Sequence, residues 1–168
     1  MKVQLVFMIF VLSICSKAFG QDAWKSWEAR YSPEDVNKII LFEKNYADSI
    51  EKDQNIPQYY ARIDNYKINA EYVGKFRSID DDVFKSMKRV FKLLIGNPDQ
   101  LDKSVKKEVL FRIDDKDIWM PIQEVLVSPL KKEIEIGAST ILYCLFINEH
   151  SNGGKLFNTF FISEFREK

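Results

Sequence analysis

Hydrophobic and polar residues change their spacing near residue 106, with helical patterns before this point and strand patterns after it. The best-marked helix starts at Ser32, a natural N-cap residue, with Pro33 at its first position and two acidic residues behind it. Its apolar stripe has helical spacing and consists of Val36, Ile39, Phe42, Tyr46 and Ile50. A second helix is predicted over residues 80–95, with three aspartates in its first turn and Gly96 at its end, followed by a short helical turn after Pro98.

Residues 57–76 fit two patterns. The spacing of one helix face is present in Tyr59, Ile63, Tyr66, Ala70 and Val73. The alternation of a strand is present in Tyr66, Ile68, Ala70 and Tyr72, and a turn at residues 64–65 would make this segment a hairpin. We favour a helix because the segment is long and poor in β-branched residues, and we keep the hairpin as the alternative.

Two hairpins are predicted in the second half of the chain. The first joins residues 109–113 and 118–120 through a four-residue loop, and Pro121 makes its second strand short or an edge strand. Residues 122–134 have helical spacing, with a fresh helical start at Ser128 and Pro129. The second hairpin joins residues 140–148 and 156–165 through the polar loop 149–155. Its run 141–147 is apolar on both faces, which predicts a central strand covered on both sides.

These elements predict an α+β fold in which N-terminal helices pack on a small, mainly antiparallel C-terminal sheet built from two hairpins. The chain has 168 residues, of which 46% are hydrophobic and 30% are charged, as in a globular domain. No repeat or Gly/Ser linker interrupts it. We therefore expect one domain over residues 21–168.

Residues 1–20 have the order of a cleavable signal peptide: Lys2, an apolar run over 3–14, and small residues at Ala18 and Gly20. The apolar run is shorter than the roughly 20 residues that span a bilayer. We expect cleavage before Gln21 and a secreted or periplasmic, soluble protein. Two alternatives remain, an uncleaved anchor and a lipoprotein attached at Cys15, whose surroundings resemble a lipobox except for Ile14.

Charge and the residue inventory exclude several functions. Removing the signal, with two lysines and no acid, leaves 23 basic and 25 acidic residues, so nucleic acid is not an expected partner. We predict no transmembrane span in the mature chain. No cofactor is predicted, because the only adjacent glycines, at 153–154, are not followed by a helix. No metal site is predicted either, because the aspartate clusters at 80–82 and 114–117 lack the order of a calcium loop.

Nucleophilic catalysis would depend on His150, the only histidine of the chain. In an extended segment Cys144 would lie about 20 Å from it, too far for a catalytic pair. We expect Cys144 to be a buried, unreactive core residue and His150 to lie in the polar hairpin loop. A hydrolase would need His150 beside Glu149 or another acid, or a pair of carboxylates.

Two groups of residues suit binding. A basic strip on the second helix consists of Lys85, Lys88, Arg89 and Lys92, and could meet anionic lipid or an acidic partner. Aromatic residues that suit a groove for a peptide or glycan are Trp24, Trp27, Tyr31, Tyr59, Tyr60, Tyr66 and Tyr72. With His150 as a further candidate, we expect a non-enzymatic extracytoplasmic protein that binds another protein, a peptide or a glycan. The alternatives are a small secreted hydrolase and a structural or inhibitor-like partner of a secreted protein.

Overall fold

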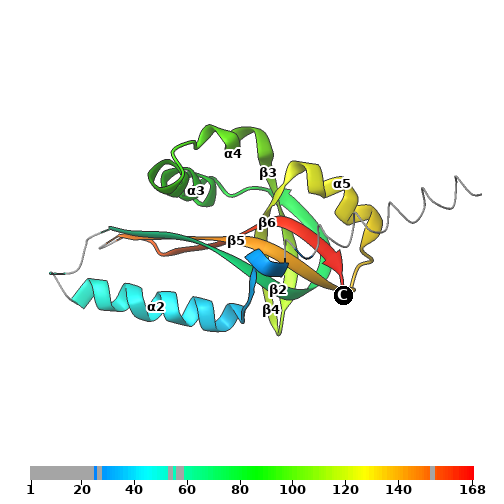
Figure 1. Cartoon of the computed structure of the whole chain (residues 1–168), viewed down its shortest axis with the longest axis horizontal. Helices are drawn as coiled ribbons and strands as arrows, with labels where there is room; N and C mark the ends of the chain where they lie inside the picture. Colours follow the sequence, from blue (N-terminus) through cyan, green and yellow to red (C-terminus); the bar gives the residue numbers. More distant parts are fainter. Residues whose placement is uncertain (1–24, 26–27, 53–54, 56–58, 152–153) are drawn as a thin grey trace, which may run out of the picture. The chain divides into compact units, whose positions relative to one another are not determined.

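Residues 25, 28–52, 55, 59–151 and 154–168 are described by a computed structural model of the chain (Figure 1). The predicted signal, Cys15, Trp24 and Trp27 lie outside these described residues. The chain divides into two units, Met1–Ser32 and Pro33–Lys168, and the second contains the helices and the sheet considered below.

The described part of this unit has four helices, α2 (Val36–Lys52), α3 (Asp81–Leu94), α4 (Asp99–Ser104) and α5 (Glu124–Glu133). Helix α3 confirms the helix predicted over 80–95. Its N-cap Asp80 accepts hydrogen bonds from the backbone N–H groups of Asp82 and Val83, and Gly96 ends it with a φ of +88°. Helix α5 confirms the helical spacing predicted within residues 122–134, and it continues through Pro129 without the fresh start that Ser128 and Pro129 would allow.

Helix α2 begins later than predicted. Ser32 and Pro33 form the short strand β1 (Ser32–Pro33), and Oδ1 of Asp35 accepts a hydrogen bond of 2.8 Å from the backbone N–H of Asn37. Asp35 therefore takes the capping role that was expected of Ser32. The buried stripe of α2 also differs from the prediction, because Phe42 is 55% exposed and the neighbouring Glu43 is buried.

The remaining strands are β2 (Tyr59–Ser78), β3 (Val105–Ile113), β4 (Lys116–Gln123), β5 (Ser139–Ser151) and β6 (Phe157–Glu167). They follow the order β2, β3, β4, β6, β5, and β5 pairs with β2, so the sheet closes on itself (Figure 1). All these neighbours are antiparallel except β4 and β6, which run parallel at Ile122 and Ile162. The α+β class is confirmed. The finer description was not exact, since β2 precedes both hairpins and α5 lies between them.

Residues 59–78 form one strand, so the favoured helix and the hairpin turn at residues 64–65 were both wrong. The first part of β2 pairs with β5, and its last part pairs with β3. The pairings change partner at Glu71, and the pairing with β3 is irregular between Tyr72 and Phe76, where Gly74 has a φ of +79°. This conformation favours glycine at an irregularity of this kind.

Both predicted hairpins are present with different limits. The turn between β3 and β4 is shorter than the predicted loop, and Asp114 adopts a φ of +53° in it. Strand β4 runs through Pro121, and its parallel pairing with β6 has one register pair, Ile122 with Ile162. In the second hairpin, β5 extends to Ser151, so Glu149 and His150 belong to the strand. Residues 152–153 lie outside the described part.

The apolar side chains form two clusters. The larger collects residues from all five strands of the closed sheet together with α2 and α5, and it fills the interior. The smaller joins α3 and α4 to the opposite face of β2, β5 and β6 through Met87, Phe91, Leu101, Ile147 and Phe161. Helices α2 and α3 consequently cover opposite faces of these three strands (Figure 1). We call the segments 59–70, 140–151 and 157–167 the ribbon.

The strand over residues 141–147 is covered on both faces, as predicted. Cys144 is 0% exposed and is a free cysteine, and burial raises the pKa of its thiol. Within the described residues, no helix has the length and apolar character needed to cross a membrane.

Candidate functional site

The register of β2 sorts the four candidate tyrosines by face. Tyr60, Tyr66 and Tyr72 face the same side as α2 and the sheet interior. Tyr60 packs against Tyr46 of α2 in a tilted arrangement, with ring centroids 4.6 Å apart, and Tyr66 packs against Phe146 at 5.7 Å. Tyr72 is 3% exposed in the core. Tyr59 lies on the opposite face with α3, so the four tyrosines do not line one groove.

The predicted basic strip is divided by ion pairs. Arg89 forms a bidentate ion pair with Glu149, in which its Nε and Nη2 donate to the two carboxylate oxygens at 2.6 Å each. The Nζ of Lys88 lies 2.7 Å from Asp102. Lys85 and Lys92 are exposed on the surface of α3. Two of the four cations are therefore matched by acids of this chain.

Glu149 is the centre of a polar cluster on the α3 face, in which both of its carboxylate oxygens accept hydrogen bonds. Tyr59 donates a hydrogen bond of 2.8 Å to the carboxylate that Arg89 also contacts. Burial alone would raise the pKa of Glu149, but hydrogen bonds from Arg89, Ser86 and Tyr59 outweigh it and lower this pKa. Burial and the hydrogen bond to Glu149 raise the pKa of Tyr59 to about 12. This cluster links two of the predicted site residues, Tyr59 and Arg89.

His150 is not a solvated loop residue, contrary to prediction. It is 4% exposed in β5, opposite Tyr60, and its Nε2 lies 3.3 Å from Oε1 of Glu51 at the end of α2. Adjacent residues of a strand point to opposite faces. His150 therefore faces α2 while Glu149 faces α3, and the acid beside the imidazole is Glu51.

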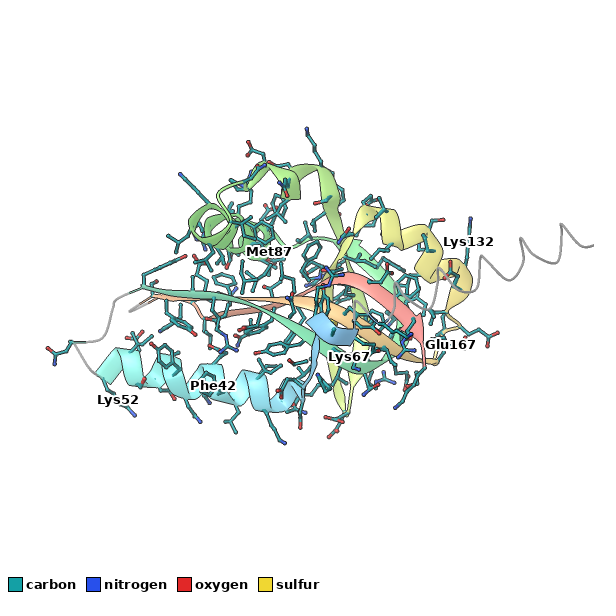
Figure 2. All side chains as sticks on the ribbon, in the orientation of Figure 1. Phe42, Lys52, Lys67, Met87, Lys132 and Glu167 are labelled. Atoms are coloured by element: carbon teal, nitrogen blue, oxygen red, sulfur yellow. The ribbon has the colours of Figure 1, made fainter. Side chains whose placement is uncertain are left out.

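A polar row crosses the ribbon beneath α2. Arg62, Asn148 and Asn158 occupy neighbouring positions on β2, β5 and β6, and Asn148 is fully buried. The Nδ2 group of Asn148 donates to the Asn158 side chain at 2.8 Å and to the Phe157 carbonyl at 3.3 Å. Glu43 of α2 adds a carboxylate that is 1% exposed, with Oε1 3.0 Å from Nη2 of Arg62. Side chains fill the space between α2 and the strands (Figure 2).

The charges in this row are only partly compensated. Burial raises the pKa of Glu43, which the Arg62 charge opposes and the Asp64 charge reinforces. Burial also opposes the charge of Arg62, but the acids and tyrosines around it, with Glu43 foremost, raise its pKa overall. Arg62 also donates a hydrogen bond of 2.9 Å to the hydroxyl of Tyr66.

Several buried polar atoms beneath α2 lack hydrogen-bond partners within the described residues. They are both carboxylate oxygens of Glu43, Nε of Arg62, Oδ1 of Asn148 and both ring nitrogens of His150. Arg62 contacts Glu43 and Asp64 at 3.0 and 2.9 Å, but these ion pairs do not have hydrogen-bond geometry. Leaving a buried polar group unpaired costs about 1–3 kcal/mol, so this concentration points to a functional region.

An open groove leads to the row. One hollow of about 280 Å³ is lined by Glu34, Lys38, Ile39, Phe42, Arg62 and Tyr66. A second of about 440 Å³ extends along residues 33–38 and 67–69 to Asp114, and it shares Glu34 and Lys38 with the first. The guanidinium of Arg62 lies 5.5 Å from the Phe42 ring and 5.4 Å from the Phe146 ring. We call the two hollows together the α2 groove.

Three predicted site residues, Tyr60, Tyr66 and His150, lie on this face. Sequence reasoning did not name Glu43, Arg62, Asn148 or Asn158. One signal for Glu43 was present, because Val36, Ile39, Glu43, Ala47 and Ile50 have better helical spacing than the predicted stripe. A carboxylate inside an apolar stripe indicates a buried charge with a partner. Among the described residues no group of three or more His, Cys, Asp or Glu side chains is arranged to hold a metal ion.

Comparisons with known proteins give little further information. No protein-family description matches the chain, and no solved structure matches it. A curated relative, an uncharacterised protein from Archaeoglobus fulgidus, is 35% identical over 48 residues, which is 29% of this chain. The matched part covers 36% of that protein, so the chain spans about a third of its relative's length.

Proposed function

We propose that this chain is an exported, extracytoplasmic binding protein without catalytic activity, and that its ligand binds in the α2 groove. The observation that carries this proposal is the position of Arg62, which lines the groove and also belongs to the buried polar row. Binding sites commonly combine apolar and aromatic walls with a few placed polar groups. Phe42, Ile39 and Tyr66 supply such walls here.

The exposure of Phe42 supports the same proposal. This side chain is 55% exposed on α2, beside the similarly exposed Leu41, and it lines the groove. Covering an exposed aromatic ring with a ligand is favourable, because apolar surface is removed from water. The ligand is a small molecule, since the hollow at Arg62 is near the lower end of the roughly 300–1,000 Å³ typical of ligand pockets.

The test is retention of small molecules by the tagged full chain. The protein is incubated with an extract of its native medium or periplasm, washed and denatured, and the released compounds are identified by mass spectrometry. We expect a compound that the natural chain retains and that Phe42→Ala loses. Leu93→Ala is the matched control, because Leu93 is a similarly exposed apolar residue on α3. Equal retention by both variants, or no retained compound, would reject the proposal.

A secreted hydrolase is the second candidate, favoured by the contact of 3.3 Å between His150 and Glu51. A histidine oriented by a carboxylate is a common general base. His150→Ala separates the two candidates: it abolishes hydrolysis if the imidazole is the base, whereas a binding protein has no hydrolytic activity to lose. Because His150 is buried, we expect this variant to lose about 1–3 kcal/mol of stability in either case, so thermal melting must accompany the assay.

A further inference from the structure

We propose that the polar row beneath α2 recognises a neutral ligand rich in hydroxyl groups, such as a monosaccharide or a cyclic polyol. This inference rests on the proposed binding function and names the chemical class of its ligand. It follows from the donors and acceptors that Glu43, Arg62 and Asn148 present, considered in turn below.

The row offers acceptors and a donor within one small region. Within the described residues, both oxygens of Glu43 and Oδ1 of Asn148 accept no hydrogen bond, although Oε1 of Glu43 lies 3.0 Å from Nη2 of Arg62. Nε of Arg62 donates no hydrogen bond, although it lies 2.9 Å from the carboxylate of Asp64. The orientation of the Asn148 amide is fixed, because its nitrogen already donates to Asn158 and to the Phe157 carbonyl. A complementary ligand must therefore donate at least twice and accept at least once.

Charged ligands satisfy only part of this requirement. A carboxylate presents acceptors alone and phosphate presents more acceptors than P–OH donors, and both anions would be repelled by the Glu43 charge. An ammonium group presents donors alone, cannot accept a hydrogen bond from Arg62 and adds a second cation beside it. A hydroxyl both donates and accepts, so neighbouring hydroxyls on one ligand can match all three residues.

The surrounding side chains suit the carbon skeleton of such a ligand. The hollow that reaches Arg62 is lined by Phe42, Tyr66 and Ile39, whose apolar surfaces can pack against C–H groups. The side chain of Arg62 is 24% exposed and lies between this hollow and Glu43. Contact between a ligand in the hollow and the rest of the row requires Arg62 to move away from Glu43, Asp64 and Tyr66.

Water also donates and accepts, so the experiment must distinguish a polyol from solvent. Saturation-transfer NMR and calorimetric titration of the full chain would use D-glucose, D-galactose, N-acetyl-D-glucosamine and myo-inositol. Sodium acetate, inorganic phosphate and methylammonium chloride serve as anionic and cationic comparison probes. We expect saturable binding of at least one of the four polyols and none of the charged probes.

Variants locate the binding. Glu43→Gln should weaken polyol binding about tenfold or more, and so should Asn158→Ala, which removes a less buried member of the row if the first variant folds poorly. Glu108→Gln is the matched control, since Glu108 is 2% exposed and pairs with Arg77 elsewhere. Absence of saturable polyol binding, or equal affinity in Glu43→Gln and Glu108→Gln, would overturn the inference. Binding of a charged probe that depends on Glu43 would also overturn it, while leaving the proposed binding function intact.

Discussion

Glu43 and Glu149 are buried carboxylates on opposite sides of the ribbon, and their hydrogen bonding differs completely. Glu149 accepts from Arg89 and Tyr59, whereas neither oxygen of Glu43 has a hydrogen-bond partner among the described residues. Burial acts on both groups, but it prevails only at Glu43, where the pKa is raised; at Glu149 the pKa is lowered. The two glutamates should therefore have opposite effects on the pH dependence of stability.

Glu43→Gln should gain stability relative to the natural chain as the pH rises. Because the pKa of Glu43 is higher in the folded state than in the unfolded state, its favourable contribution is present below the unfolded pKa and is lost as the pH passes the folded pKa. Glutamine has no such titration. Urea unfolding of both proteins between pH 4 and 8 measures the difference, and a constant difference across this range would contradict the prediction.

Glu149→Gln should lose about 2 kcal/mol of stability at pH 7, because a charge-assisted contact with the half-exposed Arg89 is weakened. The pKa of Glu149 is lowered in the folded state, so its contribution is present above the unfolded pKa and is lost as the pH falls through the folded value. The deficit of the variant should shrink in acid. A deficit that grows on acidification would show that Arg89 does not stabilise the ionised carboxylate.

Cys144 should resist thiol reagents in the folded protein, because it is fully buried and the raised pKa of its thiol suppresses the reactive thiolate. Denaturant should make labelling rapid. Cys144→Ser should cost about 1–3 kcal/mol unless its hydroxyl finds a partner, and Cys144→Ala should cost less. Stoichiometric labelling within seconds, with the circular dichroism spectrum unchanged, would contradict the burial of β5.

Export should remove residues 1–20. The intact mass of the protein recovered outside the cytoplasm should correspond to a chain that begins at Gln21, in open or cyclised form. A mass that shows acyl chains on Cys15 would instead indicate a lipoprotein and would contradict the proposed soluble localisation.

Sequence patterns predicted correctly the elements that have one solvent-exposed face or that are bounded by capping residues. Helix α3 is an example, since Asp80 caps it and Gly96 ends it. Strand β2 was harder because α2 and α3 cover its two faces, and apolar residues on both faces obscure the alternation of a strand. The parallel contact of Ile122 with Ile162 closes the sheet through residues far apart in the chain, which no local pattern reveals.

The candidate site depended on the same distant contacts. The segment around His150 is polar, as loops commonly are. In the structure His150 is nevertheless buried in β5, beside Glu51 and Tyr60. Arg62 and Asn148 appeared as ordinary polar residues until the pairing of β2 with β5 brought them together. The spacing of Glu43 within the α2 stripe was the one local signal that could have indicated this region.

Hydrogen–deuterium exchange of the full chain, with and without the compound that it retains, is the most direct test of ligand binding in the α2 groove. Backbone amides report protection segment by segment, so the measurement locates the ligand. We predict slower exchange in peptides that cover α2 and residues 59–69 of β2, with α3 and α5 unchanged. Protection confined to α3 or α5, or no change in α2, would contradict the claim.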